Sequence, residues 1–173
     1  MNKEQILKLL NHYEQSSDCR KRQVAAFIVP HGLLKHDWVT IDRKDLIIGA
    51  ANKCVLPNIN TYYCSSCDEC MKGSTKITCP AIHAEAACLS KASFDEVTSN
   101  TLFVSYSPCP DCCKLILAAG ISRVVIKEPR TKSPSVADCI FYNVNSYDEL
   151  AKKLLYNVEY VRLWEQDDDW QVS

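Results

Sequence analysis

The 173-residue sequence lacks a hydrophobic run long enough to cross a lipid bilayer. Its longest apolar stretches, residues 24–29 and 46–51, have the length of strands, whereas a membrane-spanning helix needs about 20 apolar residues. Residues 1–10 mix charged with apolar side chains, so they also lack the uninterrupted apolar segment of a signal peptide. We therefore expect a soluble, cytoplasmic protein with no membrane partner.

The sequence also lacks an excess of charge of either sign. Its formal net charge is -1, and its isoelectric point lies near 6.4. A protein that grips an extended nucleic acid backbone usually carries a basic face, so we expect no such partner here. A small anionic substrate needs only a local basic spot, and it remains compatible with this composition.

Internal repeats and low-complexity linkers are missing too. A chain of this length with 47% hydrophobic residues can form one core of reasonable size, so we expect a single domain over residues 1–173. Eleven of the 173 residues, about 6%, are cysteines, a share below that of small disulfide scaffolds. We interpret them as metal ligands and small core residues in a reducing compartment.

Hydrophobic periodicity predicts alternating helices and strands. Apolar residues at helical spacing predict helices over residues 3–16, 81–92 and 147–155, and a fourth helix is expected over residues 110–119, ended by Gly120. Strands are expected at residues 24–29, 46–51, 101–106, 123–127 and 158–164, the last at a sheet edge. The first two strands would form a hairpin, and the strand–helix–strand order of residues 101–127 predicts a parallel pair. The fold class is therefore α/β, a three-layer α/β/α sandwich with a mixed sheet of about five strands.

The most informative pattern combines His83 and Glu85 with a second half that begins at Pro108 and contains Cys109 and Cys112, with 22 residues between Glu85 and Pro108. One histidine and two cysteines can hold a zinc ion and leave a fourth position for water, as catalytic zinc requires. Cys109 and Cys112 stand i,i+3 at an expected helix start, where the helix dipole favours thiolates. Glu85 is then available for proton transfer. Since H-x-E followed by P-C-x-x-C is the known signature of zinc deaminases, we predict a catalytic zinc site.

Longer segments resemble the cytidine deaminase superfamily, and most closely its deoxycytidylate (dCMP) deaminase branch, which includes phage enzymes. The resemblance runs from about Ser17 to Lys127 and includes a Gln-Val start of the first strand at residues 23–24, the second strand ending in Asn52, and Ser-Pro-Cys at residues 107–109. It departs from the branch at Ala87, where an asparagine is common, and at residues 50–53, where Gly-Tyr-Asn-Gly is common.

The resemblance implies roles for individual residues. Glu85 would take a proton from the attacking water, deliver it to N3 of cytosine and later protonate the departing amine. The Ala84 amide and the Ser107 carbonyl would orient the base, Asn52 would bond the sugar or base, and Tyr106 would form a wall of the pocket. For Asn52 a turn-forming role remains open, and for Tyr106 a core position.

Two further groups of residues carry hypotheses. Arg20 and Arg22 precede the first strand and are candidates for binding a 5′-phosphate, although such a charge run can also be a solvated loop. A cysteine-rich insertion at about residues 54–79 contains four cysteines that could hold a second, structural zinc, with Cys19 and Cys54 as alternative ligands. These four residues are Cys64, Cys67, Cys70 and Cys79. Thiols without a metal are the alternative.

The expected function is zinc-dependent hydrolytic deamination of a cytosine nucleotide, dCMP to dUMP and ammonia. The resemblance also implies a homo-oligomer. The short motif alone leaves open a deaminase of another substrate, such as guanine, a riboflavin-pathway intermediate, tRNA or single-stranded DNA. A zinc-binding module without turnover is the third alternative; it would keep the metal ligands without needing Glu85.

Overall fold

The computed structural model describes residues 1–19, 22–29, 47–54 and 81–165, and its centre is a five-stranded sheet. Across the sheet the order is β2 (Ile48–Ala51), β1 (Ala25–Val29), β5 (Thr101–Tyr106), β6 (Arg123–Glu128) and β7 (Glu159–Arg162). β1 pairs antiparallel with β2 and with β5, whereas β6 runs parallel to both β5 and β7. The predicted mixed sheet, its hairpin, its parallel pair and its last edge strand are therefore confirmed.

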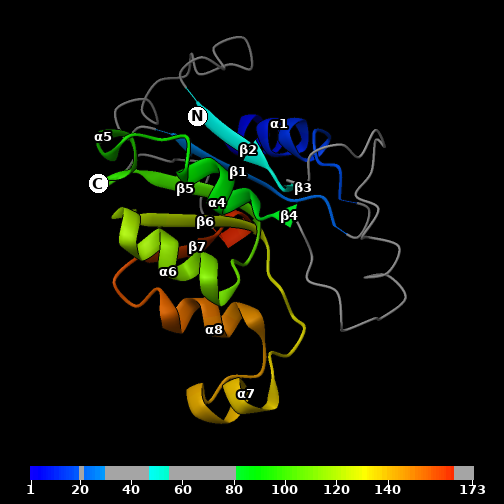
Figure 1. The fold of residues 1–173 in the computed structure, drawn as a ribbon, viewed down its shortest axis with the longest axis vertical. Helices are drawn as coiled ribbons and strands as arrows, with labels where there is room; N and C mark the ends of the chain where they lie inside the picture. The colour runs from blue at the N-terminus through cyan, green and yellow to red at the C-terminus, as the bar shows by residue number, and fades with distance from the viewer. Residues whose placement is uncertain (20–21, 30–46, 55–80, 166–173) are drawn as a thin grey trace.

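Helices cover both faces of this sheet (Figure 1). Helix α1 (Lys3–Glu14) packs on one face, where Ile6, Leu9 and Leu10 are fully buried. The other face is covered by α4 (Ala84–Leu89), α6 (Pro110–Ala119) and α8 (Tyr147–Leu154), which share a second apolar cluster. The architecture is the three-layer α/β/α sandwich expected from the sequence.

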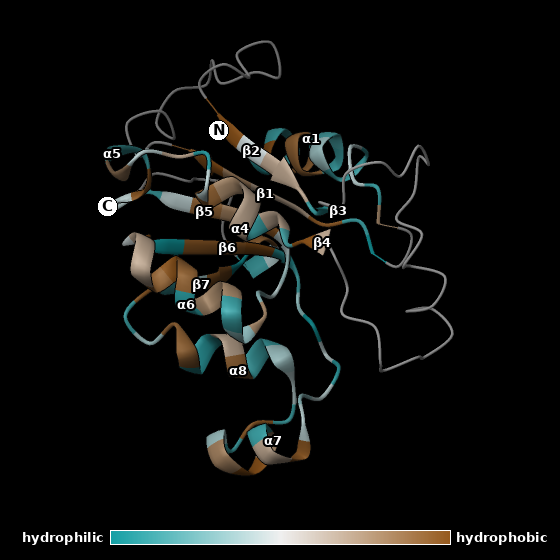
Figure 2. Cartoon of the chain, in the orientation of Figure 1, coloured by the Kyte–Doolittle hydropathy of each residue, from teal (hydrophilic) through white to brown (hydrophobic). Residues whose placement is uncertain are grey.

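The central strands alternate their side chains between the two apolar layers. In β5, Leu102 and Val104 face the layer of α4, α6 and α8, whereas Phe103 faces the layer of α1. The Phe103 ring stacks on Phe27 of β1 with 4.9 Å between ring centres. Figure 2 shows these strands as the continuous apolar centre of the molecule. A sheet buried on both faces needs such uninterrupted apolar strands.

Helix α6 connects the parallel strands β5 and β6, and its ends follow local rules. Pro110 occupies its first turn, where a missing N–H costs nothing, and Gly120 ends it at φ 76°, a left-handed conformation that suits glycine. The helix therefore has the predicted bounds. Because α6 starts directly after β5, its N-terminus lies at the carboxyl edge of the sheet, where α/β folds bind ligands.

Some elements differ from the sequence-based expectation. The helix predicted over residues 81–92 begins only at residue 84, because Ala81–Ile82 form the short strand β4, which pairs with β3 (Lys53–Cys54). The last strand ends at Arg162, where the 3-10 helix η2 (Leu163–Glu165) begins. Two short helices, α5 (Phe94–Val97) and α7 (Val136–Tyr142), were not predicted.

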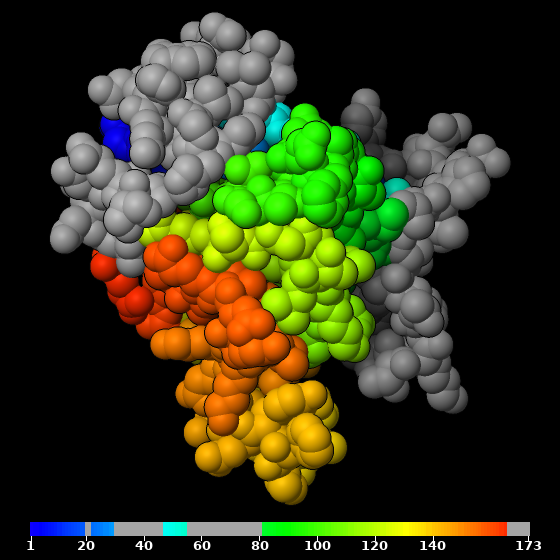
Figure 3. Space-filling model, turned by 90° about the vertical axis from the view of Figure 1, so that its left-hand side faces the viewer, coloured from blue at the N-terminus to red at the C-terminus, as the bar shows by residue number. Residues whose placement is uncertain are grey.

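Helix α7 stands apart from the sandwich in two perpendicular views (Figures 1 and 3). It buries none of its residues, and Val136, Ile140 and Phe141 are each more than three-quarters exposed. The helix thus presents apolar side chains to solvent in this single chain. Within the described part of the chain, no helix combines the length and apolar character that a membrane crossing requires.

Candidate metal centre and active site

The predicted metal ligands lie at the start of two neighbouring helices. His83 is the N-cap residue of α4, and Cys109 is the N-cap residue of α6, with Cys112 in the first turn of α6. Neither N-cap residue makes a side-chain capping hydrogen bond, and the His83 ring and the Cys109 sulfur contact each other instead. Packing between α4 and α6 joins the two halves of the motif.

The three ligand atoms converge. His83 Nδ1 lies 3.3 Å from Cys109 Sγ and 3.5 Å from Cys112 Sγ, and all three atoms lie within 4.8 Å of one another. Zinc bonds of about 2.0 Å to nitrogen and 2.3 Å to sulfur, set at a tetrahedral angle, separate these atoms by about 3.5 Å. The spacing and donor set therefore fit a zinc ion with three protein ligands and one open position.

The protonation of these groups reflects their close contact. A hydrogen bond from the Cys112 thiol lowers the pKa of Cys109 to about 4, and the same contact raises the pKa of Cys112. The hydrogen bond to Cys109 also raises the pKa of His83. The two sulfurs thus share a hydrogen bond. A divalent cation that binds both of them as thiolates displaces its proton.

Glu85 lies beside this cluster in the first turn of α4. Its side chain is almost completely buried, and burial raises the pKa of its carboxyl group. The charges of Cys109 and His83 also act on this pKa, in opposite directions, because the carboxyl group lies near both metal ligands. A buried carboxyl with a raised pKa beside a metal site is suited to proton transfer near neutral pH.

Two residues predicted to orient the base through their backbones are close in sequence to the metal ligands: Ala84 follows His83, and Ser107 precedes Cys109 by two positions. Ala84 is buried at the first position of α4, where a helical N–H has no partner within its helix. Ser107 is buried between the end of β5 and Cys109. Their predicted contacts with a base remain predictions.

Tyr106 and Arg22 lie together. The Arg22 guanidinium sits 4.8 Å from the centre of the half-buried Tyr106 ring, which ends β5 next to Ser107. A cation stacked on an aromatic ring is held in place without losing its charge. Arg22 is therefore held at the residue that ends β5, whereas Arg20 lies outside the described residues.

Asn52 makes a compact set of hydrogen bonds with the protein. Its Oδ1 accepts from the Val24 amide at 2.8 Å and the Ser17 hydroxyl at 2.7 Å, and its Nδ2 donates to the Arg22 carbonyl at 2.9 Å. The side chain thus ties β2 to the segment that leads into β1. Its predicted contact with substrate remains a prediction.

The cysteines proposed for a second zinc, Cys64, Cys67, Cys70 and Cys79, lie outside the described residues. The two alternative ligands are described and half-buried. Cys54 lies in β3 and its backbone N–H donates to the Asp18 carboxylate at 2.9 Å, while the Cys19 N–H donates to the Ser17 hydroxyl at 3.2 Å.

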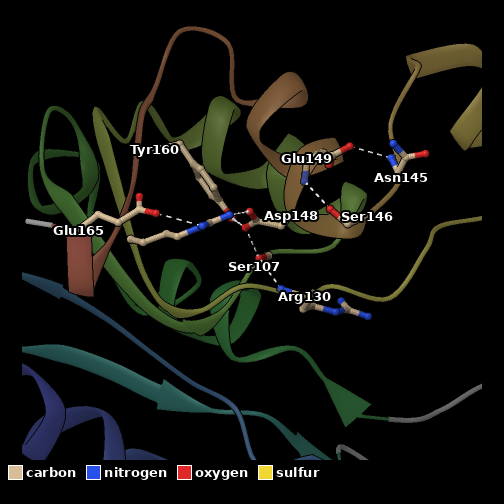
Figure 4. Close-up of polar contacts among 9 residues, drawn as sticks. Ser107, Arg130, Asn145, Ser146, Asp148, Glu149, Tyr160 and Glu165 are labelled. Carbon is tan, nitrogen blue, oxygen red and sulfur yellow. Dashed lines mark hydrogen bonds and ion pairs between the residues drawn. The ribbon is translucent and has the colours of Figure 1, made fainter.

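A polar network next to the metal centre was not found by sequence reasoning. Asp148 of α8 accepts hydrogen bonds from the Ser107 hydroxyl, the Tyr160 hydroxyl and the Arg162 guanidinium (Figure 4). Arg130, after β6, donates its N–H to the Ser107 hydroxyl at 2.9 Å. The partners of Asp148 lie 12 to 41 residues away in the sequence, so no local pattern marks them. The one signal in the sequence was an aspartate near the start of the helix expected over residues 147–155.

An α/β/α sandwich with this histidine, these two thiols and this buried carboxyl at its strand ends defines a zinc-dependent enzyme that hydrolyses its substrate. The model of the family described as "Cytidine and deoxycytidylate deaminase zinc-binding region" matches residues 1–128. The deoxycytidylate deaminase of Mycobacterium phage D29 is 31% identical over 111 residues, covering 64% of this chain and 82% of the phage protein. The chain therefore belongs to the cytidine and deoxycytidylate deaminase family.

Solved structures support the same fold. The dCMP deaminase of cyanophage S-TIM5, crystallised with dCMP and dUMP, matches with a TM-score of 0.58 and 25% identity, over 92% of this chain and 95% of that one. RibD of Acinetobacter baumannii matches with a TM-score of 0.52 and 14% identity, over 92% of this chain and 34% of that one. The second match shows the shared fold alone.

Proposed function

We propose that this enzyme deaminates dCMP to dUMP and ammonia. The observation that carries the proposal is the placement of the buried Glu85 carboxyl at a ligand set of His83, Cys109 and Cys112 that fits zinc. The similarity to the deoxycytidylate deaminase of phage D29 and to the dCMP deaminase of cyanophage S-TIM5 supports the choice of dCMP.

His83, Cys109 and Cys112 would hold the zinc. When bound, zinc acts as a Lewis acid that lowers the pKa of a coordinated water towards neutrality. Glu85 is the proton carrier. Its carboxylate takes a proton from the attacking water and delivers it to N3 of the cytosine ring as a C4–O bond forms. It then transfers the second proton of that water to the exocyclic amine, the C4–N bond breaks, and ammonia leaves. Net, one water and one amine become one carbonyl and ammonia.

Other residues of the chain would orient the base. The Ala84 N–H would act as a donor and the Ser107 carbonyl as an acceptor to the edge of the cytosine. Tyr106 would form one wall of the pocket, and Asn52 would contact the sugar or base in addition to its bonds within the protein. Such fixed contacts hold the reacting carbon close to the attacking oxygen.

Arg20 and Arg22 are proposed to bind the 5′-phosphate. Support comes from Arg22, which is stacked on Tyr106 at the carboxyl end of β5. A guanidinium can bind a phosphate through two parallel hydrogen bonds, and stacking reduces the conformational freedom that is lost on binding.

The test measures ammonia release from dCMP, dCTP, deoxycytidine, guanine and single-stranded DNA by wild type and Glu85→Gln. We expect turnover of dCMP that disappears in the variant. Turnover restricted to another member of the panel would replace dCMP as the substrate. No turnover of any member by a zinc-loaded protein would favour a binding module.

Three further proposals complete this description. The domain spans residues 1–173 with a cysteine-rich insertion at about residues 54–79, and Cys64, Cys67, Cys70 and Cys79 hold a second zinc there, with Cys19 and Cys54 as alternatives. Metal analysis should give two zinc ions per chain, and a result of one zinc ion per chain would contradict the structural site.

The cytoplasmic location stays a prediction from the sequence.

The enzyme is also proposed to form a homo-oligomer. The apolar side chains of α7, Val136, Ile140 and Phe141, are exposed in the single chain and provide surface that a second copy can cover. Light scattering after size exclusion measures the assembled mass directly.

A further inference from the structure

Ser107 connects the sheet to the metal centre. It follows the last residue of β5 and stands two positions before Cys109, so any shift of Ser107 moves a metal ligand. Its backbone N–H continues the parallel ladder by donating to the Glu128 carbonyl at 3.3 Å. The peptide on its other side carries the carbonyl that is proposed to orient the base.

The Ser107 hydroxyl is fixed by two hydrogen bonds. It donates to Asp148 Oδ1 at 2.6 Å, and it accepts from the Arg130 N–H at 2.9 Å. Ser107 is 2% exposed and Asp148 is 6% exposed, so water does not compete readily for these bonds. A short bond from a hydroxyl to a carboxylate is among the stronger hydrogen bonds in proteins.

Asp148 is itself held in place from three sides. Tyr160 of β7 donates its hydroxyl to Oδ1 at 2.7 Å, and Arg162 of β7 donates to Oδ2 at 2.8 Å. The Asp148 backbone N–H donates to the Arg130 carbonyl at 3.1 Å. The carboxylate also lies in the first turn of α8, where the helix dipole favours negative charge. A carboxylate with this many partners has one orientation.

These contacts join four elements at one point. In Figure 4, the side chains of Ser107, after β5, and Tyr160, in β7, point to the Asp148 carboxylate of α8, while Arg130, after β6, reaches Ser107 through its backbone N–H. Asp148 thus joins α8 and the edge strand β7 to the segment that leads to the metal ligand Cys109.

We propose that Asp148 is a positioning residue: its carboxylate holds the Ser107 hydroxyl and thereby fixes the Ser107–Cys109 segment at the metal centre. For the orientation of the base, the inference rests on the proposed function. For the geometry of the metal site, it rests only on the contacts of Asp148 and Ser107. The two parts have separate measurements.

The test compares Ser107→Ala and Asp148→Asn with a matched control, Glu149→Gln. The control neutralises the exposed carboxyl group next to Asp148 in the first turn of α8, which accepts a hydrogen bond from the Asn145 N–H. With full-length holoenzyme, we expect the first two variants to lower kcat for dCMP by about tenfold to a hundredfold, the effect of a small misplacement of reacting groups. Glu149→Gln should stay within about twofold, and the double variant Ser107→Ala/Asp148→Asn should be no slower than the slower single variant.

A second measurement does not depend on turnover. Cobalt(II) replacing zinc reports thiolate coordination through its visible absorption, so the bands of Ser107→Ala and Asp148→Asn should shift from those of wild type while those of Glu149→Gln do not. Unchanged bands and an unchanged kcat in folded Ser107→Ala would overturn the inference. A wild type that binds cobalt but does not turn over dCMP would refute the proposed function, and the spectral comparison would still decide the role of Asp148.

Discussion

Glu85 is buried in the first turn of α4, two residues after the metal ligand His83, which is the N-cap of the same helix. This placement brings the proton carrier of the proposed reaction next to the metal ligands and takes it out of water. A buried carboxyl group is costly for folding, so its presence here is understandable as part of a catalytic site.

Glu85→Gln should abolish deamination without unfolding the enzyme. Glutamine keeps the shape of the side chain but cannot carry the proton, and loss of a general acid/base lowers rates by about 10²–10⁴-fold. The melting temperature should stay equal or rise, because the substitution removes a group whose charged form is disfavoured by burial. Ammonia release and thermal melting measure the two effects. Glu128→Gln, at an exposed position, is the matched control and should keep full activity.

Cys112→Ala should remove one zinc ion per chain. Two remaining ligands bind a divalent ion much more weakly than three, and activity should disappear with the metal. The neighbouring Cys113 is also buried, but its sulfur is directed to the Pro108 carbonyl and it is not part of the ligand cluster. Cys113→Ala should therefore keep its zinc at a stability cost of about 1 kcal/mol. Equal zinc loss in both variants, measured by atomic absorption, would contradict the assignment of ligands.

Much of this site was predictable because its signals are local. Pro110 and Gly120 mark the two ends of α6, and the spacing of Cys109 and Cys112 follows from its first turn. The 22 residues between the motif halves had to bring α4 beside α6, and the alternation of elements made that arrangement the simplest one. For the same reason the strand bounds at β5 agree with the apolar run.

What could not be predicted depends on contacts between distant segments. Ala81 and Ile82 form strand β4 and not the start of the expected helix, because they pair with Lys53 and Cys54. This pairing with a distant segment outweighs the local preference for helix. The carboxylate of Asp148 looked like an ordinary helix-start residue, since its partners come from two other segments, one after β5 and the other in β7. Helix α5 was detectable in principle, because Ser93 and Glu96 form a capping box.

Charge reversal at Arg20 and Arg22 should affect the nucleotide more than the nucleoside. If these residues bind the 5′-phosphate, Arg20→Glu/Arg22→Glu raises KM for dCMP strongly and leaves KM for deoxycytidine nearly unchanged. Steady-state kinetics with both substrates give the comparison. Lys152→Glu, an exposed change of the same charge on α8, controls for long-range electrostatics. Parallel increases for dCMP and deoxycytidine would remove the phosphate role.

Substitutions on α7 should change assembly and leave the fold intact. Phe141 is 80% exposed and Ile140 is 77% exposed, so Ile140→Ser/Phe141→Ser removes apolar surface without creating a cavity. Light scattering should show a smaller assembly than wild type at equal concentration. The same double change at Leu115 and Leu117, partly exposed on α6, is the control for general loss of surface hydrophobicity. An unchanged mass in the α7 variant would place the subunit contact elsewhere.

Asp148 should contribute stability that depends on pH. Burial alone would raise its pKa, but hydrogen bonds from Ser107, Arg162 and Tyr160 outweigh burial and lower it below the ordinary value. The folded state therefore binds the Asp148 proton more weakly than the unfolded state, whose aspartate pKa is about 3.9. The stabilisation is complete above that pKa and is lost as pH falls through the lower pKa of the folded state.

The consequence is a stability difference between wild type and Asp148→Asn that narrows in acid. At neutral pH the variant should be about 1.5–3 kcal/mol less stable, the range for hydrogen bonds to a charged group. Below about pH 4 the two unfolding free energies should approach each other, because protonated Asp148 no longer attracts Arg162 as a carboxylate does. Urea unfolding between pH 7 and pH 3 measures the difference. Since Asp148 also holds Ser107, a constant gap over this range would mean that the carboxylate acts through packing and not through its charge.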